Sequence, residues 1–190
     1  MPIFDGVDYM WRLDDDSMIT APVHYDVFEF MQKKDIWYGW NIMDVGSCVK
    51  SLWETTEQFL SVTGSSPGWF KSLPEKSLYY NNFEISRVAL WRSREYQRFF
   101  AFLDQSMGIY KHRWGDAPIK TIGVSLFVPK AKIHKFTDVS YAHQHVRTGP
   151  LIAVVLQAPK KVFWEPAWQK GGLRGANALT LHVKHEDMLK

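Results

Sequence analysis

Short apolar segments alternate with amphipathic helical segments along most of the chain, and this alternation constrains the fold most strongly. Strands or extended segments are predicted at 7–13, 36–40, the beginning of 79–90, 133–136 and 151–156. Helices are predicted at 26–34, 49–62, 93–105 and 116–126. Interleaved strands and helices are typical of the α/β class, in which helices cover a sheet.

The composition supports a folded domain and excludes several classes of protein. The chain has 190 residues, of which 46% are hydrophobic and 23% charged, so disorder and coiled coil are excluded. A net charge of +3 is too small to indicate nucleic-acid binding. Aromatic residues make up 15%, and aromatic rings line sugar and nucleotide sites as well as cores. The single cysteine, Cys48, excludes an intrachain disulfide.

Three consecutive acids, Asp14, Asp15 and Asp16, follow the first predicted strand directly. Ligands gather at the carboxyl ends of strands in α/β proteins, and paired carboxylates suit a hard divalent cation. A solvated turn with a helix cap is the alternative for this cluster. His143 and His145 are two residues apart and share a face if they lie in a strand, so one of them is a further candidate ligand.

Two other groups of residues are candidates for a substrate cleft. Glu84 interrupts an apolar extended segment, and it either lines a cleft or faces solvent. Arg113 and Trp114 precede Asp116, and these residue types grip anions and stack on sugars. Taken alone, Asp116 is better explained as the N-cap of a helix with Pro118 in its first turn.

Six segments, in this order, resemble glycosyltransferase family 15, the fungal-type α-1,2-mannosyltransferases. They are WRLDDDS, VHYDVFEFMQKKDIWYGW, LWETTEQF, YYNNFEISRVALWRSREYQRFFAFLDQS, IYKHRWGDAPIKTIGVSLFVPKAKIHKFTD and SYAH. The resemblance implies a GT-A fold, a Rossmann-like α/β domain around a mixed sheet. It implies retaining transfer of mannose from GDP-mannose to a mannosylated glycan or glycoprotein acceptor, with Mn²⁺ as cofactor.

The resemblance also assigns roles to particular residues. It implies that Asp14, Asp16 and His143 bind the metal and that Glu84 is the carboxylate near the anomeric carbon. We expect Arg113, Trp114, Asp116 and Tyr141 to bind substrate. Glu84 then acts either as a nucleophile or as the stabiliser of an oxocarbenium-like state.

Three departures from the family pattern shape the remaining expectations. Asp14 stands where the family has a longer glutamate. The family's N-terminal part is not matched, so residues 1–147 are expected to be the C-terminal portion of the catalytic domain. Residues 148–190 are expected to form a divergent C-terminal segment. The intact family member is expected in the Golgi membrane, facing the lumen, whereas this sequence shows no membrane span and no targeting segment. A non-catalytic or truncated relative that binds a glycan or a partner is the alternative function.

Overall fold

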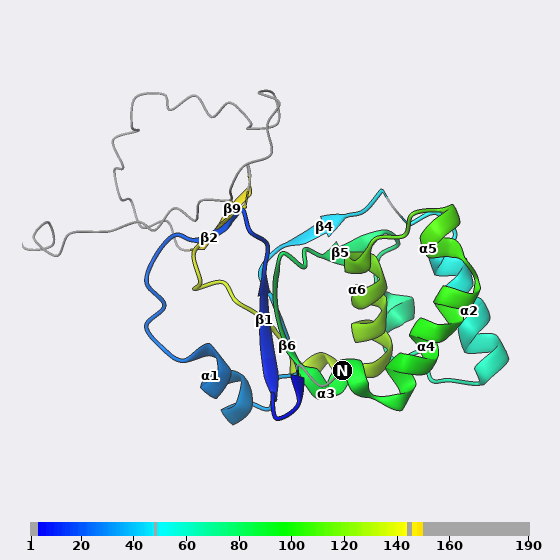
Figure 1. The fold of residues 1–190 in the computed structure, drawn as a ribbon, viewed down its shortest axis with the longest axis horizontal. Coiled ribbons are helices and arrows are strands. Elements are labelled where there is room, and N and C mark those ends of the chain that lie inside the picture. The colour runs from blue at the N-terminus through cyan, green and yellow to red at the C-terminus, as the bar shows by residue number, and fades with distance from the viewer. Residues whose placement is uncertain (1–3, 48, 144–145, 150–190) are drawn as a thin grey trace, which may run out of the picture. The chain divides into compact units, whose positions relative to one another are not determined.

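The computed structural model describes residues 4–47, 49–143 and 146–149 (Figure 1). Its strands are β1 (Tyr9–Leu13), β2 (Ser17–Ile19), β3 (Tyr38–Trp40), β4 (Met43–Val45), β5 (Ser77–Tyr79), β6 (Phe83–Arg87), β7 (Ile133–Lys135), β8 (Tyr141–His143) and β9 (Val146–Thr148). Its α-helices are α1 (Val27–Lys33), α2 (Leu52–Thr63), α3 (Val88–Arg92), α4 (Arg94–Gln105), α5 (Gly108–Lys111) and α6 (Asp116–Phe127). Two short 3-10 helices are η2 (Phe70–Ser72) and η3 (Lys130–Lys132).

A four-stranded main sheet has the order β1-β6-β3-β7. β6 is antiparallel to both of its neighbours, and β7 is parallel to β3. The sheet is therefore mixed, and the expected α/β class with a mixed sheet is confirmed. Two small antiparallel sheets, β2-β8-β9 and β4-β5, complete the strand pairing.

Helices cover the two faces of the main sheet. Phe83 and Ile85 of β6 point to one face, where they pack with Val27 and Met31 of α1. The opposite face carries Tyr38, which packs with Val124 of α6 and with Val128, the residue that follows this helix. Figure 1 shows α2, α4, α5 and α6 together on one side of β1 and β6, with α1 on the other.

The helices form largely where the sequence predicts them. The Asp26 side chain accepts hydrogen bonds from the backbone N–H groups of Phe28 and Glu29 and so caps α1. The Ser93 side chain caps α4 by accepting from the backbone N–H of Tyr96, as expected. The buried face of α4 joins α2 and α6 in one apolar cluster.

Two local expectations were wrong. Gly115, not Asp116, is the N-cap of α6, and Asp116 is the first helical residue. Its carboxylate binds other elements instead of its own helix, as described below. The sequence predicts no strand between residues 136 and 151, yet Tyr141–His143 forms β8 because it pairs with β2.

Some expectations fall outside the described residues. They concern His145, the predicted strand at 151–156, and all but the first two residues of the predicted C-terminal segment at 148–190. In the part of the chain that is described, no helix has the length and apolar character needed to cross a membrane.

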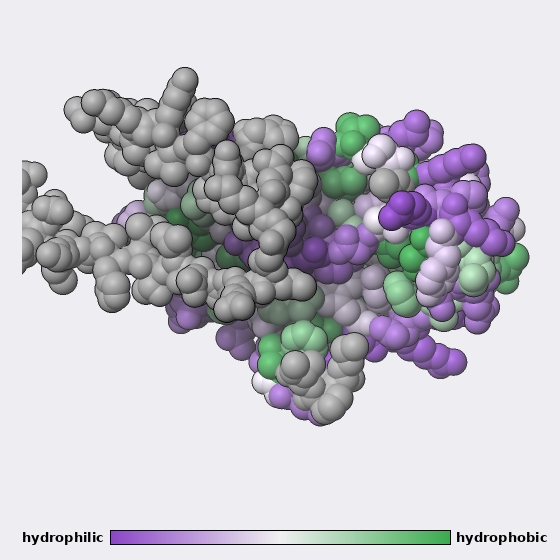
Figure 2. Space-filling view, turned by 45° about the horizontal axis from the view of Figure 1, so that its top comes forward, coloured by the Kyte–Doolittle hydropathy of each residue, from purple (hydrophilic) through white to green (hydrophobic). Residues whose placement is uncertain are grey.

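The described surface around α2, α4 and α5 is mostly hydrophilic, with hydrophobic residues in scattered groups (Figure 2). The exposed large apolar side chains in this region include Val62, Phe100 and Tyr110. Scattered exposure of this kind is ordinary for folded proteins.

Candidate active site

Three residues on neighbouring strands direct their side chains to one face of the main sheet. Glu84 of β6 pairs with Arg12 of β1 on one side and with Trp40 of β3 on the other. Directly opposed residues of an antiparallel pair share a face, and side chains alternate along each strand. Tyr38 and Ser86 therefore share this face as well, which is the face that α6 covers.

Glu84 is buried completely, with 0% of its surface exposed. Its Oε1 accepts a hydrogen bond from Lys120 Nζ at 2.8 Å and from Ser86 Oγ at 3.4 Å. Its Oε2 accepts from the Tyr38 hydroxyl at 3.2 Å. A buried carboxylate persists when a cation and hydrogen-bond donors compensate its lost hydration. The solvent-facing alternative for Glu84 is therefore excluded.

The environment of Glu84 also fixes the state of Tyr38. Burial, and then the negative charge of Glu84, raises the pKa of the Tyr38 hydroxyl well above its ordinary value. Tyr38 therefore stays protonated and remains a hydrogen-bond donor to Glu84.

Asp116 lies where the start of α6 meets β1. Its Oδ2 accepts hydrogen bonds from Arg12 Nη1 and from Asn81 Nδ2, the latter at 2.8 Å. Arg12 also binds Asp14 through Nη2 at 3.2 Å. Partial desolvation acts to raise the pKa of Asp116, but the hydrogen bonds from Arg12 and Asn81 hold it below the ordinary value. Asp116 is thus an ionised, exposed carboxylate in a fixed position.

His143 and Asp16 form a second pair of polar residues. His143 Nδ1 lies 3.0 Å from Asp16 Oδ1 and 3.4 Å from Ser17 Oγ. The Tyr141 hydroxyl lies 2.8 Å from Ser17 Oγ and donates to the Asn82 carbonyl at 3.2 Å. The antiparallel pairing of β2 with β8 places Ser17 directly opposite His143, so the sheet itself brings this group together.

The Asp16–His143 pair suits a divalent transition metal in its chemistry, since carboxylate oxygen and imidazole nitrogen are both good ligands for such ions. Asp14 points instead to Arg12. In the described part of the chain, no group of three His, Cys, Asp or Glu side chains is arranged to hold a metal. The chemistry of the pair therefore fits two ligands of such an ion, and its role as a metal site stays a prediction.

The other two predicted substrate-binding residues, Arg113 and Trp114, differ in their exposure to solvent. Arg113 is exposed, and its backbone adopts a left-handed conformation with φ of 56°. Trp114 is buried in the cluster formed by α2, α4 and α6, and its Nε1 donates to the Lys50 carbonyl at 2.5 Å. A Cβ on Gly108 would lie 2.2 Å from the Trp114 ring, so the glycine makes room for the indole.

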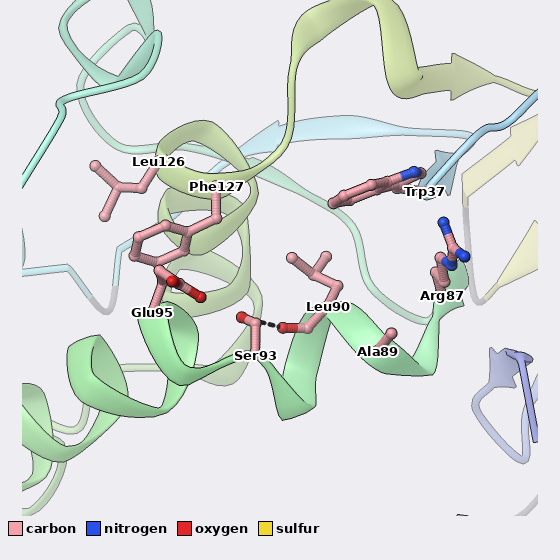
Figure 3. A pocket seen from close by; sticks show the side chains of 8 residues that line it. All are labelled: Trp37, Arg87, Ala89, Leu90, Ser93, Glu95, Leu126 and Phe127. Atoms are coloured by element: carbon pink, nitrogen blue, oxygen red, sulfur yellow. Dashed lines mark hydrogen bonds between the residues drawn. The ribbon is translucent and has the colours of Figure 1, made fainter.

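A separate pocket of about 590 Å³ lies where α3 and α4 meet the end of α6 (Figure 3). Trp37 and Arg87 line one side of it, and Glu95 and Phe127 line the other. The predicted site residues do not line this pocket.

Sequence reasoning missed four residues of the candidate site: Arg12, Tyr38, Asn81 and Lys120. Each contacts a predicted residue that is distant in sequence, such as Lys120 with Glu84 and Arg12 with Asp116. A charged residue at position 12, inside an apolar strand, was the one available signal.

Comparison with known proteins assigns the chain to a family. The family model described as "Glycolipid 2-alpha-mannosyltransferase" matches residues 2–161. The chain belongs to this family. It is 33% identical over 171 residues to the alpha-1,2 mannosyltransferase KTR1 of Saccharomyces cerevisiae, covering 84% of this chain and 44% of KTR1. It is 34% identical to glycolipid 2-alpha-mannosyltransferase 2 of Candida albicans, covering 79% and 35% of the two chains.

Solved structures of mannosyltransferases share the fold. The GDP complex of Ktr4p from S. cerevisiae superposes with a TM-score of 0.74 at 29% identity, covering 79% of this chain and 44% of that one. Core-mannan synthase A (CmsA/Ktr4) from Aspergillus fumigatus, in a Mn/GDP form, gives 0.71 at 31% identity, covering 79% and 46%. The chain thus has the expected GT-A glycosyltransferase fold. It spans less than half the length of these relatives.

Proposed function

We propose that this chain carries the catalytic residues of an α-1,2-mannosyltransferase that transfers mannose from GDP-mannose to a mannosylated glycan or glycoprotein, with retention. The observation that carries the proposal is the buried Glu84–Lys120 pair beside the exposed Asp116, in a chain that belongs to a mannosyltransferase family. Solved relatives bind GDP, and one of them does so with manganese.

Mn²⁺ held by Asp16 and His143 would neutralise the charge that develops on the departing diphosphate. Asp14 remains a proposed ligand, although it binds Arg12 in this structure. Asp116 and Arg113 are proposed to contact substrate. Trp114 and Tyr141, which were expected to bind substrate, are both buried, so we propose that they support this region from within the core.

Glu84 has no surface to offer the sugar, because it lies beneath Lys120. We therefore propose that Glu84 acts through the groups that it holds and not as a nucleophile. If no other carboxylate acts as the nucleophile, retention requires departure and attack on the same face of the sugar. For the whole protein, we propose a position in the Golgi membrane with this part in the lumen.

Calorimetric titration of GDP-mannose into the chain, with Mn²⁺ and then with EDTA, tests the proposal. We expect binding with Mn²⁺ and its loss in EDTA, followed by mannose transfer to an α-mannoside acceptor. A folded chain that binds the nucleotide sugar equally in EDTA would contradict the metal assignment. A folded chain that binds a mannan but no nucleotide sugar would favour a glycan-binding function instead.

A further inference from the structure

Lys120 separates the buried Glu84 from solvent. Its Nζ lies 2.8 Å from Glu84 Oε1, and 19% of its side chain is exposed, against 0% for the glutamate. A ligand that enters the site from solvent therefore meets the ammonium group before it meets the carboxylate.

Among the residues that the structure describes, the ammonium group of Lys120 has a donor to spare. Of its three N–H donors, one is directed to Glu84, and the face of the Trp91 ring, 5.2 Å away, accommodates a second. Arg12, a second cation on this face of the sheet, is held between two carboxylates, those of Asp14 and Asp116. Lys120 is held by one carboxylate, so its ammonium group is able to donate to a ligand as well.

The charges around Lys120 favour a neutral ligand over an anionic one. In the three ion pairs described here, the carboxylates of Asp14, Glu84 and Asp116 share the two cations Arg12 and Lys120, so this paired group carries a net negative charge. A phosphate would add negative charge to this excess. A sugar hydroxyl carries no charge and accepts from an ammonium group while donating to a carboxylate.

Asp116 supplies the matching acceptor. It lies four residues before Lys120 in α6, so the two side chains share a face of the helix. The Asp116 side chain is 62% exposed, and Arg12 and Asn81 fix its Oδ2, which leaves lone pairs for a hydroxyl. A donor and an acceptor fixed side by side are suited to a sugar with adjacent hydroxyl groups.

We propose that Lys120 binds hydroxyl groups of the mannose of the donor, and that Glu84 is a positioning residue that holds the Lys120 ammonium in place. This inference rests on the proposed function and adds to it a specificity-determining residue. The transferred mannose, and not the diphosphate or the acceptor, is the part of the reaction that it assigns to Lys120.

The experiment compares Lys120→Met, Glu84→Gln and the double variant with the unaltered chain. Calorimetry with Mn²⁺ measures the affinity for GDP-mannose and for GDP, and kinetics gives KM for the donor and for an α-mannoside acceptor. We expect Lys120→Met to weaken GDP-mannose about tenfold and GDP less than twofold, because a hydrogen bond from a charged donor is lost. The acceptor KM stays unchanged.

The double variant tests whether the pair acts as one unit. If Glu84 acts only through Lys120, adding Glu84→Gln to Lys120→Met produces no further loss of GDP-mannose affinity. The double variant also removes the buried charge that Lys120→Met leaves without a partner, so it remains informative if the single variant fails to fold. Lys120→Arg is expected to restore more than half of the affinity lost in Lys120→Met.

Lys132→Met is the matched control. Lys132 also binds a carboxylate, that of Asp35 at 2.5 Å, and also lies over a tryptophan, Trp37, at 4.6 Å. We expect this variant to bind GDP-mannose like the unaltered chain. That result would show that removing a lysine from a carboxylate and a tryptophan ring does not by itself weaken GDP-mannose binding.

Several results would overturn the inference. If Lys120→Met weakens the binding of GDP and of GDP-mannose equally, Lys120 contacts the diphosphate. If only the acceptor KM changes, Lys120 contacts the acceptor. Unchanged affinity in Lys120→Met with strong loss in Glu84→Gln would show that Glu84 meets the sugar directly. An unaltered chain that binds GDP but not GDP-mannose overturns this inference, whereas one that binds neither overturns the proposed function itself.

Discussion

At the scale of single residues, the site depends on a carboxylate that is buried without any exposed surface. Lys120, Tyr38 and Ser86 together supply donors to both oxygens of Glu84. In a buried environment each missing donor leaves part of the desolvation cost uncompensated. The network is therefore expected to matter for stability as well as for function.

Removal of the Tyr38 hydroxyl tests this network. Tyr38→Phe keeps the ring packing but leaves Glu84 Oε2 without its donor, so we expect a loss of about 1–3 kcal/mol in the free energy of unfolding. Urea denaturation followed by circular dichroism measures it.

Tyr79→Phe is the control for this prediction. The Tyr79 ring packs 5.3 Å from that of Tyr38 and is also buried, but its hydroxyl makes no hydrogen bond to a described residue. We expect a loss below about 0.5 kcal/mol, as for changes away from such networks. Equal losses in the two variants would show that Glu84 does not depend on the Tyr38 hydroxyl.

The same network shows what the sequence alone can predict about a site. Glu84 and Asp16 stood out because charged residues are unexpected inside or directly after an apolar strand. Lys120 did not, since a lysine on a helix is ordinary, and its partner lies 36 residues away in the chain. Only the packing of α6 against the main sheet brings Lys120 to Glu84 and so reveals its role.

At the scale of elements, helix positions were predictable from apolar spacing, but the ends of helices were less so. Ser93 and Asp26 cap their helices because their side chains accept hydrogen bonds from backbone N–H groups of the first turn. Asp116 has the right residue type for an N-cap, yet Arg12 and Asn81 offer it charge-assisted and amide hydrogen bonds across the sheet. Asp116 is therefore the first residue of α6 and not its N-cap, so the helix begins one residue earlier than predicted.

The connection from α5 to α6 depends on the absence of a side chain at Gly108. In Gly108→Ala the new Cβ would lie 2.2 Å from Trp114, whose ring is held by its bond to Lys50 and by the surrounding core. We expect a destabilisation of about 1–3 kcal/mol by overpacking, measured by thermal unfolding.

Gly115→Ala is the matched change for that prediction. Its Cβ would lie 3.4 Å from Pro118, an ordinary contact, and its φ of −74° suits any residue. We expect a change below about 1 kcal/mol, in line with the modest loss when a glycine N-cap becomes alanine. A Gly108→Ala variant as stable as Gly115→Ala would mean that the Trp114 ring moves freely.

At the scale of the whole molecule, family membership was predictable because the matching segments occur in order along the chain. The fold class followed from the alternation of strands and helices, and the family resemblance supplied the mixed sheet. The assembly of the candidate metal pair was not predictable from spacing. Asp16 and His143 are far apart in sequence, and they meet because β2 pairs with β8, two strands that the sequence did not predict.

This pairing leads to a prediction about ligand-linked stability. A ligand that binds only the folded state stabilises it by about 2.7 kcal/mol at a concentration of 100 times its Kd. If Asp16 and His143 hold Mn²⁺, then GDP with Mn²⁺ should raise the Tm by several degrees, and EDTA should reverse the rise. His143→Ala should abolish the rise, because it removes one of the two ligands that the structure brings together. His112→Ala, at an exposed position beside the Trp114 ring, should leave the rise in Tm unchanged.

A Tm rise of equal size in His143→Ala would mean that His143 does not bind the metal. A comparison of Asp14→Asn with Asp16→Asn would then show which carboxylate contributes.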